Sequence, residues 1–277
     1  MSELPKFGYL TNPVVDILKE IKAAARLGFD YVEIGLEWPE GTVEYLLRKK
    51  DRILDLLRKH KIFAVGHTAW WIDFSSPYQA VRKAWIIESK RKIDIAKELG
   101  IKKTNFHAFS SRSLHNFPEN YVKTLLNNCV LSLREIVKYG KKFGMITMLE
   151  NCPKGITDFE DFKYIIDNVP GLKVNFDVAH AFVCSGMKDV KKYIKNFSSK
   201  IEHVHLSDNH GKEDEHLPIG KGDINFKKVV KMLKHINYDK TITLEVFTEN
   251  EKDVVGSRER IEKLWEMIKC LKVGLIK

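Results

Sequence analysis

The chain has 277 residues, of which 44% are hydrophobic and 30% are charged, values that are ordinary for a soluble globular protein with one large core. It contains no apolar run near the roughly 20 residues that span a bilayer, and it does not begin like a signal peptide, so we expect a cytoplasmic protein without a membrane partner. The net charge is +10, but only ten of the 47 basic residues are arginine, so the charge indicates either a solvated lysine-rich surface or an anionic partner.

Short β-rich runs alternate with longer amphipathic segments along the chain. The predicted strands are Lys6–Leu10, Tyr31–Leu36, Ile62–His67, Lys102–His107, Met145–Glu150, Leu172–Asp177, Ile201–Leu206 and Thr241–Val246. The predicted helices, with apolar residues three or four positions apart, are Val14–Leu27, Val43–Lys59, Tyr78–Leu99, Tyr121–Phe143, Phe159–Asn168, Asp189–Phe197, Phe226–Ile236 and Ser257–Leu271. Eight strand–helix units predict a parallel sheet closed into a single (β/α)8 TIM barrel, with residues 1–277 forming one domain.

Glycines support this division into units. Gly28, Gly100 and Gly144 each follow a predicted helix and stand directly before the next strand, where a left-handed residue commonly ends a helix.

The four cysteines lack CxxC spacing and are predicted to be free, buried thiols: Cys129, Cys152, Cys184 and Cys270.

Side chains that can bind metals stand at the ends of six consecutive predicted strands. From the third strand to the eighth, they are His67, His107, Glu150, Asp177, His205 and Glu245. Parallel α/β barrels carry their active sites at this rim, so these side chains are expected to converge. Converging carboxylates repel one another unless protons or cations lie between them, which predicts a bound divalent metal ion.

The expected metal ligands are Glu150, Asp177, His205 and Glu245. Three carboxylates with one imidazole suit Mn²⁺, Mg²⁺ or Co²⁺ and tolerate Zn²⁺. His203 lies on the same face of its strand as His205 but one layer deeper, and we expect it to be structural. Trp70, Trp71 and Phe74 follow the third strand and either wall a sugar pocket or pack beneath a loop.

At these residues the sequence resembles the xylose isomerase-like TIM barrel superfamily, which includes sugar isomerases, sugar epimerases and type IV apurinic endonucleases. The resemblance covers nearly the whole chain, and its most specific segments are Leu149-Glu150-Asn151, Phe176–His180, His203–Asn209, Asp214–Gly222 and Leu244-Glu245. It implies the same four metal ligands in both branches of the superfamily.

In the isomerase and epimerase branch, the resemblance implies proton transfer next to the carbonyl of a small sugar, through a metal-stabilised enediolate. Glu150 and Glu245 would form the acid–base pair on either side of the substrate. His180 would bind a substrate hydroxyl, and Trp70 would line the pocket. A phosphorylated sugar would need Lys221 or loop lysines, because no arginine lies between residues 134 and 258.

The endonuclease branch implies up to three Zn²⁺ ions and abasic DNA as the partner. The residue types of its additional ligands are present, at His67, His107, His180, Asp214 and His216. The residues after two strands depart from that branch, because 108–111 replace a glycine- and serine-rich stretch and 152–154 replace a threonine- and glycine-rich loop. We therefore expect a sugar isomerase or epimerase, with an apurinic endonuclease as the alternative. The particular sugar, the number of metal ions and whether the chain forms a homo-oligomer stay open.

Overall fold

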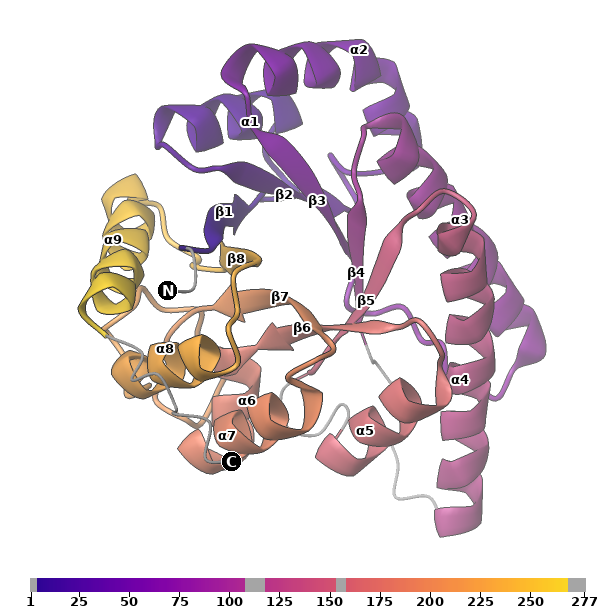
Figure 1. Cartoon of the computed structure of the whole chain (residues 1–277). Helices are drawn as coiled ribbons and strands as arrows, with labels where there is room; N and C mark the ends of the chain where they lie inside the picture. The colour runs from indigo at the N-terminus through magenta and orange to yellow at the C-terminus, as the bar shows by residue number, and fades with distance from the viewer. Residues whose placement is uncertain (1–3, 108–117, 153–157, 269–277) are drawn as a thin grey trace, which may run out of the picture.

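A computed structural model describes residues 4–107, 118–152 and 158–268. Cys270 and segments 108–111 and 153–154, on which part of the sequence interpretation rested, lie outside these residues. Eight parallel strands close into a barrel in chain order, which confirms the predicted (β/α)8 fold (Figure 1).

The strands are β1 (Lys6–Leu10), β2 (Tyr31–Leu36), β3 (Phe63–Thr68), β4 (Lys103–His107), β5 (Ile146–Glu150), β6 (Lys173–Asp177), β7 (Ile201–Leu206) and β8 (Thr241–Leu244). The helices around them are α1 (Ile17–Arg26), α2 (Val43–His60), α3 (Gln79–Glu98), α4 (Glu119–Lys141), α5 (Phe159–Asn168), α6 (Val178–Ser185), α7 (Met187–Phe197), α8 (Phe226–His235) and α9 (Glu251–Met267). In the part of the chain described, no helix is long and apolar enough to cross a membrane.

Every predicted strand and helix is present, with small shifts at the ends. The largest shift is in α9, which begins six residues before the predicted Ser257, at Glu251. Helix α6 was not predicted, because it follows β6 with no intervening loop. Asp177 both ends the strand and caps the helix, its Oδ1 accepting a hydrogen bond of 2.6 Å from the His180 backbone N–H.

The glycines predicted to end helices have the expected left-handed backbone conformation. Gly28, Gly100 and Gly144 have φ values of 75°, 73° and 67°, which L-residues with a Cβ adopt only at a cost. Cys129 is a buried free thiol, as predicted, and Cys152 is also buried, whereas Cys184 is half-buried.

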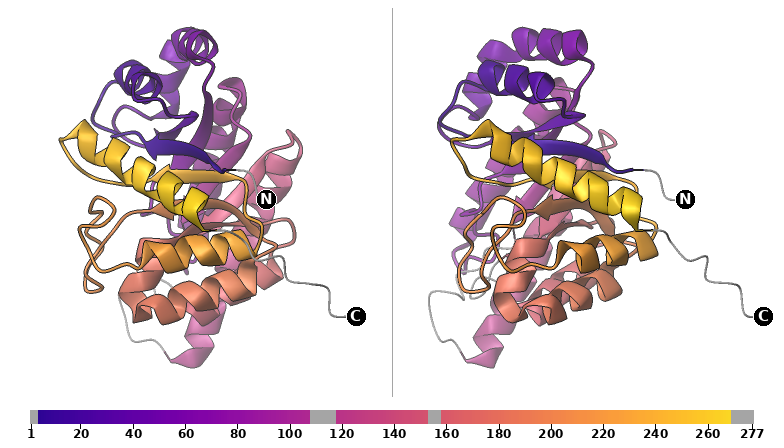
Figure 2. Two further views of the ribbon diagram at one scale, coloured as in Figure 1. Left: turned by 60° about the vertical axis from the view of Figure 1, so that its left-hand side comes forward. Right: turned by 90° about the vertical axis from the view of Figure 1, so that its left-hand side faces the viewer.

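The main hydrophobic core lies between the barrel and its helices, and the barrel interior is filled separately. Tyr31, Val65 and Met148 form an apolar cluster inside the barrel. Because side chains two residues apart on a strand share a face, Val65 and Met148 lie one step below His67 and Glu150. Figure 2 shows α8 and α9 side by side, with α9 running across the side of the barrel where β1 lies.

Candidate metal centre

The predicted quartet converges at the carboxyl ends of β5 to β8. One ligand atom from each of its four residues lies within 4.8 Å of the others, in the set Glu150, Asp177, His205 and Glu245. His205 Nδ1 is 2.9 Å from Glu245 Oε2, 3.4 Å from Glu150 Oε1 and 3.9 Å from Asp177 Oδ2. The register explains this convergence, because Asp177 pairs with His205 across β6 and β7.

Two further groups flank the quartet. On one side, His107 Nε2 and His67 Nε2 lie 3.3 and 3.7 Å from Glu150 Oε2. On the other side, the Asp214 Oδ2 atom is 2.9 Å from His180 Nε2 and 3.0 Å from His216 Nε2. Each group has the spacing of a potential metal site. The nine residues named as metal ligands from the sequence are therefore brought together.

The protonation states of the site indicate that it suits a cation. Burial raises the pKa of Asp177 to about 7, and the carboxylates of Glu245, Glu150 and Asp214 add to the increase although His180 opposes it. Burial alone would also raise the pKa values of Glu150 and Glu245, but the positive field of His205 holds both below their usual range. The ionised forms of Glu150 and Glu245 are thus stabilised by the positive field of His205, and a cation at this point would stabilise them in the same way.

Unsatisfied polar atoms support the same conclusion. Among the described residues, Glu150 Oε1, Asp177 Oδ2 and both ring nitrogens of His67 are buried without a hydrogen-bond partner. Buried polar atoms in proteins are normally paired, and these atoms belong to residues of two potential metal groups that share Glu150. The donor set of carboxylate oxygens and imidazoles fits a divalent cation.

Glu33 on β2 is a part of this site that the sequence analysis missed. Its side chain is fully buried, and it accepts hydrogen bonds from His205 Nε2 at 3.1 Å, from His203 Nε2 at 3.1 Å and from the Thr243 hydroxyl. His205 thus lies between two carboxylates, with Nδ1 turned to the quartet and Nε2 to Glu33. Carboxylate partners of this kind orient metal-binding histidines in many proteins.

Glu150 is held in a similar way by two asparagines. Asn105 donates to its Oε2, and Asn175 Nδ2 donates to the same oxygen at 2.9 Å, which leaves Oε1 without a hydrogen-bond partner among the described residues. Asn105 and Asn175 stand two positions before His107 and Asp177 on their strands. The same inward-facing spacing relates His203 to His205, so a search two residues upstream of each rim residue would have found these supporting side chains.

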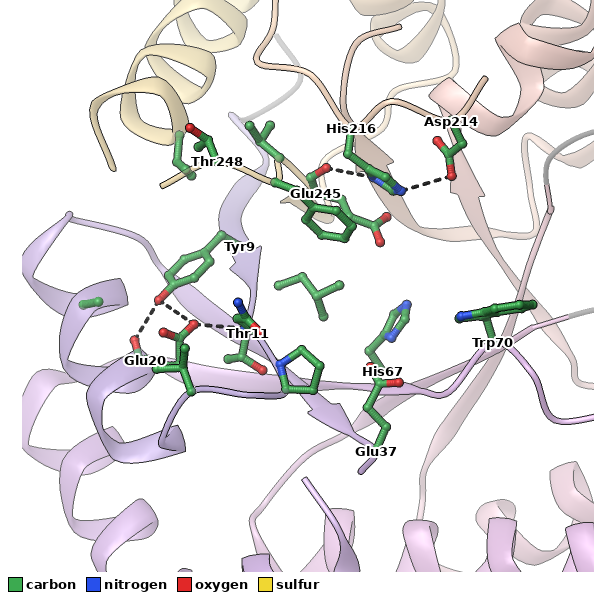
Figure 3. Close-up of a pocket in the computed structure, with 18 of the residues that line it drawn as sticks. Tyr9, Thr11, Glu20, Glu37, His67, Trp70, Asp214, His216, Glu245 and Thr248 are labelled. Atoms are coloured by element: carbon green, nitrogen blue, oxygen red, sulfur yellow. Dashed lines mark hydrogen bonds and ion pairs between the residues drawn. The ribbon is translucent and has the colours of Figure 1, made fainter. Parts of the chain in front are cut away.

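A cavity of about 1030 Å³ opens above the quartet. It is lined on the metal side by His67, His107, His180, Asp214, His216 and Glu245. Glu150, Asp177 and His205 are fully buried directly beneath it. Figure 3 shows Glu245 and His67 facing each other across the cavity, with Trp70 at one side.

The aromatic residues after the third strand were predicted either to wall a pocket or to pack beneath a loop, and the structure shows both. Trp70 and Trp71 line the cavity and are 53% and 42% exposed, whereas Phe74 is fully buried and packs against Phe106. Phe74 is therefore core and not a cavity wall. Lys221 is exposed and is not among the lining residues, so the structure does not bring it to the other predicted site residues.

Comparisons with known proteins agree with this geometry. The family model described as xylose isomerase-like TIM barrel matches residues 21–270. An uncharacterized protein of Methanocaldococcus jannaschii is 31% identical over 261 residues, which cover 91% of this chain and 86% of that protein. A probable endonuclease 4 of Aquifex aeolicus is 25% identical over 270 residues, covering 90% and 93%.

Among solved structures, a D-tagatose 3-epimerase-like protein superposes with a TM-score of 0.81 at 29% identity, covering 94% of this chain and 97% of that one. The residues that the family model matches include all of the potential metal ligands at the rim of the barrel. The chain belongs to the xylose isomerase-like TIM barrel family.

Proposed function

We propose that this protein is a divalent-metal-dependent sugar epimerase or isomerase that acts on an unphosphorylated sugar. The observation that supports this most strongly is the cavity above the quartet. Its described lining residues include three tryptophans and several acids but no lysine or arginine. A carbohydrate without charge fits such a wall, whereas a phosphate would meet carboxylates and would find no lysine or arginine among the described lining residues.

In this proposal, Glu245 and Glu150 transfer the proton at the carbon next to the carbonyl. Glu245 lines the cavity, and its Oε2 lies 2.9 Å from His205 Nδ1. Glu150 lies beneath the cavity, and the two asparagines on Oε2 direct its free Oε1 toward the quartet. One carboxylate removes the proton and the other returns it from the opposite side.

A divalent ion bound by the quartet would supply Lewis-acid stabilisation of negative charge on the substrate oxygens. His180, proposed to bind a substrate hydroxyl, has Nδ1 directed at the Asn151 carbonyl at 2.8 Å and Nε2 at Asp214 at 2.9 Å. It therefore meets the substrate chiefly as part of the pair with Asp214. Trp70 and the neighbouring Trp71 would pack their ring faces against the sugar.

The second candidate is a zinc-dependent apurinic endonuclease. Two observations favour it, namely the ligand groups on both sides of the quartet and the similarity to a probable endonuclease 4. Endonucleases must bind phosphates, and protein affinity for DNA comes largely from lysine and arginine contacts. The acidic cavity wall therefore ranks this candidate second. The prediction that residues 1–277 form one domain stays a prediction under either candidate.

The proposal is tested by proton exchange. Purified protein loaded with Mn²⁺, Co²⁺, Mg²⁺ or Zn²⁺ is incubated with D-tagatose, D-psicose or D-fructose in D₂O, and the products are followed by NMR. We expect epimer or aldose formation with solvent deuterium on the carbon next to the carbonyl. Glu150→Gln and Glu245→Gln should each lower turnover by about 10²–10⁴-fold, because each removes a proton-transfer group.

Glu202→Gln serves as the control, since Glu202 lies at the other end of β7 and bonds Lys103 and Lys240. Its turnover should match that of the wild type. Product without solvent deuterium would exclude the two-glutamate mechanism. Nicking of abasic duplex DNA that disappears in His216→Ala, without any ketose turnover, would replace the proposal by the endonuclease.

A further inference from the structure

The cavity extends well past the metal ligands. Beyond His67 and Glu245 it continues between α1, the end of β1 and α9, where it is lined by Tyr9, Val15, Glu20, Ala23, Leu27, Glu251 and Val254. We call this part the distal arm. In Figure 3, Tyr9 and Glu20 lie on the opposite side of His67 from Trp70, so the metal ligands stand in the middle of the cavity and not at its end.

The distal arm has an apolar floor and a hydrogen-bonding edge. Ala23 and Leu27 come from one face of α1, and Val254 faces them from α9. The Tyr9 hydroxyl donates to the Glu20 backbone carbonyl at 3.0 Å, which fixes the ring as a wall. Glu20 Oε2 already accepts the Asn12 backbone N–H at 3.1 Å, and its second oxygen can accept from a ligand.

The electrostatics of the distal arm exclude anions. Glu20 and Glu251 line the distal arm, Glu37 and Glu249 line the same cavity, and no lysine or arginine lines it among the residues described. The Arg26 guanidinium is bonded by two nitrogens to the carboxylate of the lining residue Glu251, at 2.8 and 2.6 Å. Because this pair is already formed, a phosphate would have to displace a carboxylate to bind here.

The cavity is also larger than a single sugar ring requires. About 1030 Å³ is at the upper end of the range for pockets that hold drug-sized ligands, and a single hexose is a much smaller molecule. The Trp38 side chain, which is 72% exposed, also lines the cavity and offers a ring face to a second group.

We propose that the substrate is a sugar with an uncharged glycosidic substituent, and that the distal arm binds this substituent while the reacting sugar lies over the quartet. The substituent is a second sugar ring or an apolar aglycone, both of which present hydroxyl and C–H groups to the same walls. This inference rests on the proposed function. Binding energy from such a remote group commonly raises the rate at the reacting carbon as well as the affinity.

The test compares three ketoses that differ only at O6. These are D-fructose with a free hydroxyl, isomaltulose with a glucosyl group and D-fructose 6-phosphate with a charged group. We expect kcat/KM for deuterium exchange to be about tenfold or more higher for isomaltulose than for D-fructose. The phosphate should be the poorest of the three. This comparison uses the wild-type metal-loaded enzyme and depends on no variant.

A pair of variants locates the effect. Ala23→Phe fills the distal arm, and Ala25→Phe makes the same change at another half-buried position of α1 that does not line the cavity. Ala23→Phe should abolish the preference for isomaltulose over D-fructose, whereas Ala25→Phe should keep this preference.

Two results would overturn the inference while leaving the proposed function intact. One is turnover of D-fructose with an equal or lower kcat/KM for isomaltulose. The other is a preference that survives in Ala23→Phe. Absence of turnover for all ketoses would instead overturn the proposed function, and this inference with it.

Discussion

Replacing Glu33 by glutamine should weaken metal binding although Glu33 does not belong to the quartet. Its carboxylate accepts hydrogen bonds from His205 and His203 at 3.1 Å each and from the Thr243 hydroxyl. Burial alone would raise the pKa of Glu33, but the two histidines hold it well below the usual value, so the group is an anion that only accepts. Glutamine has one acceptor oxygen and places an NH₂ donor against one of these N–H donors.

The expected loss of metal affinity in Glu33→Gln can be estimated in two ways. Leaving one buried donor unsatisfied costs about 1–3 kcal/mol. Mutation of the carboxylate behind a metal-binding histidine typically lowers metal affinity about 10–100-fold, which corresponds to roughly 1.4–2.7 kcal/mol. The two estimates agree because both describe a His205 ring that no longer has its Nε2 proton held by an anion. We therefore expect Kd for the metal to rise about 10–100-fold.

The assay is isothermal titration of chelator-treated protein with Mn²⁺ or Co²⁺. Glu202→Gln is the matched control, because Glu202 is also a largely buried glutamate but bonds lysines instead of histidines. It should leave the metal Kd unchanged. A Glu33→Gln protein that is folded by circular dichroism and binds the ion as tightly as the wild type would refute the orienting role of Glu33.

Two further predictions concern stability. A Cβ on Gly8 would lie 2.4 Å from the ring of the buried Tyr31, so Gly8→Ala should lower the free energy of unfolding by about 1–3 kcal/mol in denaturant melts. The control is Gly256→Ala in helix α9, where a Cβ would meet nothing within 4 Å, and this variant should be neutral or stabilising. Equal changes in the two variants would contradict this packing argument. Burial alone would raise the pKa of Glu202, but hydrogen bonds from Lys103 and Lys240 lower it. The ionised Glu202 side chain therefore stabilises the folded protein above its unfolded pKa of about 4.3, and this stabilisation is lost as the pH falls through its pKa in the folded protein. Glu202→Gln should therefore have a lower Tm than the wild type at neutral pH, with a difference that shrinks below about pH 4, and a constant difference would contradict it.

The sequence by itself determined the barrel and most of its rim. Alternating strand and helix patterns are local signals, and glycines such as Gly28 mark where helices end, so the strand order needed no tertiary information. A parallel barrel then brings the carboxyl ends of all strands to one rim, which is why residues as distant as His67 and Glu245 could be placed in one site from their positions alone.

Tertiary structure decided what supports that rim and what faces it. Glu33 meets His205 only because β2 and β7 face each other across the closed barrel, and no local pattern marks a buried acid on a strand as a partner of a distant histidine. The distal arm lies between α1 and α9, which come from opposite ends of the chain and are linked by the Arg26–Glu251 pair. Lys221 and Phe74 both lie in loops that follow strands, but the direction of each side chain depends on how its loop packs: Lys221 is exposed and Phe74 is buried. Sequence periodicity determines which face of a strand or helix a residue occupies, whereas contacts between elements depend on packing that only the folded chain provides.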